Sequence, residues 1–403
     1  MRTMTLALAM LIVALVAPLW ACLWDSDTLS AEARGATDVV RAITGRFDRN
    51  PPIYYAMRLA RAASRVEADP RDFHAYDDAG VACDRLGRPA EAIAWMDRKA
   101  KALADAERVG VPPDEQAVRG DDRYRMLANL GTFRIHRWIQ AGADRSATDD
   151  LRLGRDAIAE ALRINPQAHF GREGVQLAIA DGLLNPALRV DSGYLPPLID
   201  LPVDPGVLDA SIAGLTGIIT LGAGFESVDV LHTLQLALLK RGHSSLAELA
   251  GLRVDELVAA GKRSMIPGAS TDPKSLAMSA RPHPGLGFWY DDAPNPAMIE
   301  QTFATLRSEA ESTHAARLAF MLPRLESGRH PDTDRDFWSG YDEPKAPDLG
   351  GELVPIPAPR SLRDRLLARS DLFATIAILV ASYFVIRRIF RRDRRAATAA
   401  TRA

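Results

Sequence analysis

Cysteine, aromatic residues and overall charge are all scarce in this sequence. Its 403 residues include two cysteines, Cys22 and Cys83, which excludes a disulfide framework or a zinc site built from cysteines. Aromatic residues make up only 6% of the chain, and its Ala-rich and Arg-rich segments favour helices over a β-sandwich or barrel. The net charge of −2 conceals an uneven distribution, because residues 387–403 carry seven Arg and one Asp. Residues 23–386 therefore hold nine more acidic than basic side chains, so no nucleic-acid partner is predicted for this body.

Recognisable catalytic motifs are also missing. The chain contains no metal-binding H-E-x-x-H, no Walker A loop, no G-x-S-x-G elbow and no Rossmann glycine fingerprint. No two of its eight histidines are spaced three or four residues apart, the spacing that would pair them as metal ligands on one helix face. We therefore predict a protein that is not an enzyme, with no catalytic residue, no cofactor and no metal.

Two kinds of side chain invite a chemical role but have simpler explanations. Cys83 lies within an apolar helical pattern, which favours a small buried side chain over a reactive thiolate. The carboxylates of Asp77, Asp78 and Asp84 suggest a cation site, but a solvated acidic helix face explains them more simply.

The N-terminus is typical of an exported protein. Arg2 is followed by an uncharged run from Met4 to Leu23, and residues 1–21 are predicted to be a signal peptide. The sequence Leu19-Trp20-Ala21-Cys22 resembles a bacterial lipobox, which makes Cys22 the candidate lipidation site, although Trp20 is bulkier than the usual residue. Cleavage without lipidation, or an uncleaved membrane anchor, remains open as an alternative.

The C-terminus is typical of a single-pass membrane protein. Residues 372–386 carry no charge and are followed by an Arg-rich segment, so a transmembrane helix is predicted at 371–390. The positive-inside rule places the basic tail, 391–403, in the cytoplasm and the body outside it. The Pro- and Gly-rich segment 340–370 is predicted to be an extended stalk with a juxtamembrane segment. The alternative, a buried core helix, fits the flanking Arg cluster less well.

Residues 71–104 carry the clearest structural pattern. Two helices, Phe73–Arg85 and Pro89–Ala104, are predicted on either side of a short turn that contains Gly87. This unit resembles a tetratricopeptide repeat (TPR), a helical hairpin of about 34 residues. The positions that carry the resemblance are Tyr76, Ala79, Gly80, Gly87, Ala92 and Met96.

Weaker echoes of the same unit follow along the chain. Tyr124–Gln140 with Leu151–Ile164 forms a second candidate, and Val228–Arg241 with Ser245–Ala260 forms a third. The predicted fold is all-α, a TPR-like α-solenoid of helical hairpins plus one C-terminal transmembrane helix. Its predicted parts are N-terminal helices at 22–70, the repeats at 71–184 and an irregular helical region at 185–339.

The TPR resemblance implies a groove that binds a protein or peptide partner. In that family the groove is lined mainly by the first helix of each pair. The corresponding candidate residues are His74, Asp77, Val81, Asp84 and Arg85 in the first unit, and Arg125, Asn129, Thr132 and His136 in the second. The expected function is therefore a non-enzymatic, membrane-tethered scaffold outside the cytoplasm of a bacterial cell, anchored by its C-terminal helix and basic tail.

Two other functions remain open. An enzyme of the cell envelope would need an active site assembled from distant residues within 185–340. A lipoprotein-type assembly factor would share the scaffold and differ in its partner. Aromatic side chains at 288–290 and 337–341 are predicted to pin loops onto the helical body, with an exposed recognition patch as the alternative.

Overall fold

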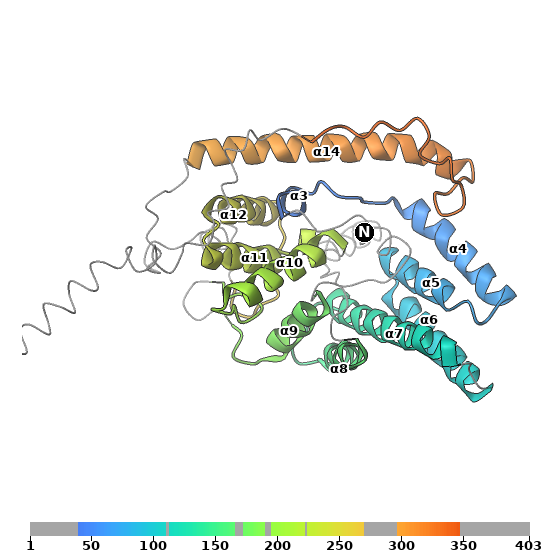
Figure 1. Cartoon of the computed structure of the whole chain (residues 1–403). Coiled ribbons are helices and arrows are strands. Elements are labelled where there is room, and N and C mark those ends of the chain that lie inside the picture. Colours follow the sequence, from blue (N-terminus) through green and yellow to red (C-terminus); the bar gives the residue numbers. More distant parts are fainter. Residues whose placement is uncertain are drawn as a thin grey trace, which may run out of the picture. The chain divides into compact units, whose positions relative to one another are not determined.

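A computed structural model describes most of the chain between residues 39 and 346. The described residues are 39–109, 113–165, 172–189, 195–221, 224–269 and 296–346. Every regular element among them is helical, which confirms the all-α prediction (Figure 1). By its internal contacts the chain divides into two units, Met1–Pro347 and Asp348–Ala403, and every described residue belongs to the first.

Several predictions fall outside the described residues. They are the signal peptide, lipidation at Cys22, the transmembrane helix at 371–390, the basic tail and the aromatic residues 288–290. Within the described ranges, no helix combines the length and apolar character needed to cross a membrane.

The helices follow one another with short connections through most of the first unit. They are α3 (Val39–Thr44), α4 (Pro52–Ala68), α5 (Phe73–Arg85), α6 (Pro89–Val109), α7 (Pro113–Gln140), α8 (Asp149–Ile164), α9 (Arg172–Leu184), α10 (Pro205–Leu221), the 3₁₀ turn η2 (Gly224–Glu226), α11 (Val228–Arg241), α12 (Ser244–Ala259) and α14 (Pro296–Glu326). The predicted limits of α5 and α11 are confirmed to the residue, whereas α7 begins eleven residues before the predicted Tyr124.

Local chemistry fixes the hairpin of α5 and α6. The Asp72 side chain accepts a hydrogen bond from the Ala75 backbone N–H and so caps the start of α5. The helix ends before Gly87, whose φ of 76° lies in the left-handed region that glycine adopts most easily. Pro89 then begins α6, at a position where its missing N–H costs no hydrogen bond.

Consecutive helices pack against each other from α4 to α9, and α5 also contacts α7 directly. The core between α5, α6 and α7 includes Tyr76, Ala79, Met96 and Phe133, all of them buried. Gly80 lets the Met96 and Phe133 side chains approach the backbone of α5, because glycine has no side chain in their way.

Helices α7 and α8 meet at two glycines. A Cβ atom placed on Gly131 would lie 2.7 Å from the Gly154 carbonyl oxygen, and one placed on Gly154 would lie 2.7 Å from the Gly131 carbonyl oxygen. Both distances are shorter than any van der Waals contact, so these two helices are in backbone contact that only glycine permits.

The long helix α14 contacts α3, α4 and α12, although it lies far from α3 and α4 in sequence (Figure 1). These contacts are rich in ion pairs, including Arg46 with Glu309 at 2.8 Å and Arg307 with Glu256 at 2.9 Å. Residues 327–346, which we call the strap, continue from α14 and reach α4.

The strap explains the aromatic residues at 337–341. Phe337 is fully buried beside Tyr54, and the Trp338 ring stacks on Phe320 of α14 with centroids 5.9 Å apart. These side chains therefore pin the strap to the helical body, as predicted. Arg46 also donates to the Pro344 carbonyl oxygen, which ties the first residues of the predicted stalk to the body at this point, although residues 342–346 are exposed.

Candidate functional site

The nine residues predicted to line a groove come together on α5 and α7. Six of them are buried, with exposed fractions of 2% or less: Asp77, Val81, Asp84, Asn129, Thr132 and His136. Arg85 and Arg125 are half-buried, and His74 is exposed. The shared placement agrees with the expected arrangement of first helices, but most of this surface is an internal polar layer and not an open groove.

A buried lysine organises one half of this layer. The Lys99 ammonium group, on α6, donates to Asp77 Oδ2 at 2.6 Å and lies 3.7 Å from Asp122 Oδ1. Asn129 Nδ2 donates to the other Asp77 oxygen at 3.2 Å. Burial raises the pKa of Asp77, while the charge of Lys99 and its hydrogen bond oppose that rise. The lysine thus keeps a desolvated carboxylate partnered within the protein.

The other half of the layer joins the hairpins to later helices. His136 Nδ1 lies 2.8 Å from Asp84 Oδ1, and both side chains are buried. Gln176 Nε2, on α9, donates to Thr132 Oγ1 at 2.9 Å. Arg85 Nη2 donates to the carbonyl oxygen of Leu221, the last residue of α10, at 2.6 Å. Helices α9 and α10 therefore cover part of the surface that the sequence predicted to be a groove.

The interpretation of Asp77, Asp78 and Asp84 as a solvated acidic face is wrong, because all three are buried. Each carboxylate has a basic or amide partner on a neighbouring helix, which offsets the cost of desolvation. One sequence signal for this layer was missed. Lys99 lies at helical spacing from the buried residues Met96 and Leu103, and a lysine in an apolar stripe requires a buried acidic partner.

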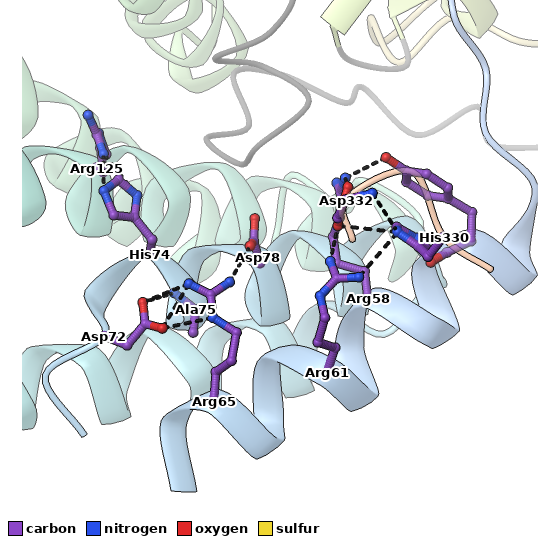
Figure 2. A network of polar contacts seen from close by, with 11 residues as sticks. Arg58, Arg61, Arg65, Asp72, His74, Ala75, Asp78, Arg125, His330 and Asp332 are labelled. Atoms are coloured by element: carbon purple, nitrogen blue, oxygen red, sulfur yellow. Dashed lines mark hydrogen bonds and ion pairs between the residues drawn. The ribbon is translucent and has the colours of Figure 1, made fainter. Parts of the chain in front are cut away.

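The accessible end of the same face carries His74 and Arg125, and Figure 2 shows them pointing toward each other. Arg125 Nη1 lies 3.2 Å from His74 Nδ1, and Arg125 Nη2 donates to Asp121 at 2.7 Å. Arg65 of α4 pairs through two hydrogen bonds with Asp72 and reaches Asp78 at 3.4 Å. This polar row leaves donors and acceptors near solvent on three adjacent helices.

The far end of the row in Figure 2 is closed by the strap. Arg58, which is fully buried, donates through Nε and Nη2 to the two oxygens of Asp332 at 2.8 and 2.7 Å, and Arg61 donates to the same carboxylate. His330 Nε2 contacts the Tyr54 carbonyl oxygen at 3.1 Å. Sequence reasoning missed this cluster, because 274 residues separate Arg58 from Asp332 and nothing local links them.

The described part of region 185–340 contains two buried titratable side chains on α11, His232 and Asp229. Burial lowers the pKa of His232, whose ring nitrogens contact the Leu195 carbonyl oxygen and the Gln235 side chain. Asp229 instead accepts from Ser264 Oγ at 2.5 Å and from the Met265 backbone N–H at 2.8 Å. The histidine is thus engaged elsewhere and is not bonded to the serine, so these groups do not form a nucleophile–base pair. No group of three potential metal ligands occurs within the described ranges.

Asp229 gives a pH-dependent stability that can be measured. Burial raises its pKa to about 6, above its ordinary value of 3.8, although Met265, Ser264 and the charge of Arg145 oppose the rise. The folded state therefore binds the proton more tightly than the unfolded state, and this group contributes less stability as the pH rises from about 4 to 6. We expect Asp229→Asn to gain stability relative to the parent across that interval, with no further change above it. Urea unfolding of both proteins as a function of pH tests this, and a pH-independent difference would contradict it.

Cys83 is completely buried, as predicted for a small apolar side chain. Burial raises the pKa of its thiol to about 12, so the thiolate needed for nucleophilic or redox chemistry is not populated near neutral pH. The residue fills space between helices and takes no part in the polar layer.

Comparisons with known proteins give no match: no family model, no curated protein and no solved structure is similar to this chain. The candidate site is therefore interpreted from its own geometry. At its accessible end that geometry presents charged and hydrogen-bonding side chains, those of His74, Arg125 and Asp121.

Proposed function

We propose that this protein is a non-enzymatic scaffold of TPR-like helical hairpins that binds a protein or peptide partner. The observation that carries the proposal is the direct packing of α5 on α7 in addition to α6. This packing makes the first helices of the two candidate units neighbours, and it brings His74 and Arg125 together at the accessible end of their shared face. A chain that stacks hairpins in this way supports binding of an extended segment across adjacent helices.

The binding surface proposed is the accessible end of the α5–α7 face, with His74, Arg125 and Asp121 as its polar groups. The six buried groove candidates lie in the interior polar layer of α5 and α7 and are not part of this accessible surface. Charge reversal at Asp77 or Asp84 would test folding and not binding, because both carboxylates are buried and partnered.

The location of the scaffold is proposed from the two ends of the sequence. An N-terminal export signal, with Cys22 available for lipidation, and a C-terminal membrane helix with a basic tail would tether the body outside the cytoplasm. In a variant that also carries Cys22→Ala, so that no lipid holds the N-terminus, removing residues 371–403 should release the protein from the membrane fraction. A truncated protein that stays with the membranes would contradict a tether at this end.

The partner is tested by photo-cross-linking inside cells. A photoreactive amino acid at position 74 of the full-length protein should give a discrete product with one partner protein. The same amino acid at Arg152, which is exposed on α8, serves as the control and should not give that product. No product at position 74, or the same product at both positions, would contradict binding at this face.

A matched pair of charge reversals sharpens the test. Arg125→Glu should abolish the cross-link from position 74, while Arg123→Glu, on the exposed side of the same helix, should leave it intact. The Arg125 side chain is only 14% exposed and its charge favours the ionised form of Asp77, so circular dichroism must show that both variants keep their helices before their cross-links are compared. Equal loss of the cross-link in both variants would point to a general charge effect.

A further inference from the structure

A second surface lies on the other side of α5, where a pocket of about 400 Å³ opens between the α4–α5 turn and the C-terminal half of α6. Tyr76 marks its position, because the Tyr76 ring is turned toward α6, with its centroid 6.1 Å from that of Trp95. His74 is turned toward Arg125 of α7 instead. The pocket is therefore separate from the surface proposed above for partner binding.

Basic side chains dominate the wall of this pocket. Arg71, Arg98 and Lys101 all line it and are exposed. The one acidic lining residue, Asp105, pairs with Arg108 at 3.2 Å outside the pocket wall. Among the residues described, none of the three cations has a carboxylate partner, in a body that carries nine more acidic than basic residues.

Arg98 is held in position by aromatic side chains. Its guanidinium carbon lies 4.0 Å from the centroid of the Trp95 ring and 5.9 Å from that of Tyr76. Stacking occupies the flat faces of a guanidinium group and leaves the N–H groups at its edge free to donate. Tyr76 is fixed in turn, because its hydroxyl donates to the Pro70 carbonyl oxygen at 3.3 Å.

The pocket also offers an apolar contact. Val109, at the end of α6, lines it and is 71% exposed, which is unusual for a large aliphatic side chain. Ala102 and Ala106 line the pocket between the basic residues and Val109. A ligand that fits this wall carries negative charge together with a small apolar group.

We propose that this pocket binds an acidic peptide segment of a partner protein, with carboxylates on Arg98, Lys101 and Arg71 and an apolar side chain against Tyr76 and Val109. A carboxylate suits the fixed edge of Arg98, which can donate two parallel hydrogen bonds to it. The volume accommodates one or two side chains, so the pocket anchors a segment and does not enclose a whole ligand. This site is distinct from the proposed binding surface on α5 and α7. A result that contradicts one of the two proposals does not contradict the other.

The probe is a labelled peptide of alternating Glu and Leu residues, titrated against the purified full-length protein by fluorescence anisotropy. Binding should weaken with added salt, and a peptide with Lys in place of Glu should not bind. Arg71→Ala with Lys101→Ala, which leaves the Arg98 stack intact, should weaken binding by about tenfold or more. A charge-reversal variant of the pocket, Arg98→Glu with Lys101→Glu, needs a control of equal charge change elsewhere. The control is Arg152→Glu with Arg163→Glu, two exposed residues of α8. This control should change the affinity less than about twofold.

Three results would overturn the proposal. One is the absence of binding at peptide concentrations of about 1 mM. Another is equal binding of the Glu and Lys peptides, and the third is an equal loss of affinity in the pocket variants and the α8 control. Circular dichroism of every variant confirms that the helices are retained. Because the assay uses no cellular partner and leaves His74 and Arg125 unchanged, its outcome is independent of the cross-linking test.

Discussion

Replacing Lys99 by Met is expected to lower the free energy of unfolding by about 3–5 kcal/mol. Lys99 is fully buried and is the cation that Asp77 faces at 2.6 Å, with Asp122 at 3.7 Å. Methionine has a similar length and no charge, so the variant fills the space but leaves two carboxylates without their counter-charge. The loss should appear as a lower midpoint in urea unfolding followed by far-UV circular dichroism.

The matched control is Lys101→Met, two residues further along the same helix. Lys101 is exposed, so the same chemical change there should alter stability by no more than about 0.5 kcal/mol. Adding Asp77→Leu to the Lys99→Met variant should recover part of the loss, because an apolar pair of suitable volume can replace a buried ion pair. Equal effects at positions 99 and 101 would mean that Lys99 is not buried as an ion pair.

The second large effect is expected at the contact between α7 and α8. Gly131→Ala should destabilise the protein by about 1–3 kcal/mol, because its new methyl group would lie 2.7 Å from the Gly154 carbonyl oxygen and 2.6 Å from Ile158 Cγ1. The backbone of α8 cannot rotate away as a side chain can, so the two helices must separate. Gly131→Leu should cost more.

Gly174→Ala provides a control with the opposite sign. Gly174 lies within α9, and a Cβ atom placed there meets no other atom within 4 Å. Alanine should therefore stabilise the protein by about 0.5–1 kcal/mol through its higher helix propensity. If both substitutions stabilise the protein in thermal unfolding, α7 and α8 are further apart than the structure places them.

The sequence predicted the helices well where an apolar stripe and end signals coincide. Residues 228–241 are an example, since Ser227 caps the start of α11 and Gly242, with a φ of 92°, follows its end. The start of α7 was missed, because residues 113–123 are mostly polar and show no apolar stripe. A periodicity argument needs apolar residues at helical spacing, and the sequence of this part of α7 contains few of them.

The burial of the candidate site residues was not predicted from the sequence. Family resemblance placed Asp77 and Asn129 on facing helices, and the structure brings them within hydrogen-bonding distance. Lys99 at helical spacing from Met96 and Leu103 does signal a buried acidic partner, but the contacts from α9 and α10 follow from the tertiary fold and no local pattern reports them. The same limit applies to the strap, because pairing between residues 58 and 332 follows from the tertiary fold alone.

The bond between the strap and α4 has a consequence for how the chain is made. The ribosome produces residues 39–109 first, and their mutual contacts can form as soon as they emerge. The bond between Arg46 and Glu309 can form only after 263 further residues have been added to the chain. The bond between Arg58 and Asp332 requires 274 further residues. At about 5–20 residues per second, that delay is on the order of tens of seconds.

During this interval Arg58 and Arg61 of α4 lack the Asp332 carboxylate, and the aromatic surface around Tyr54 lacks Phe337. A nascent chain in this state exposes the face of α4 that the strap contacts in the complete protein. The contacts between α4 and the strap therefore cannot form until the strap has been synthesised, and a chain that ends before residue 327 cannot make them at all.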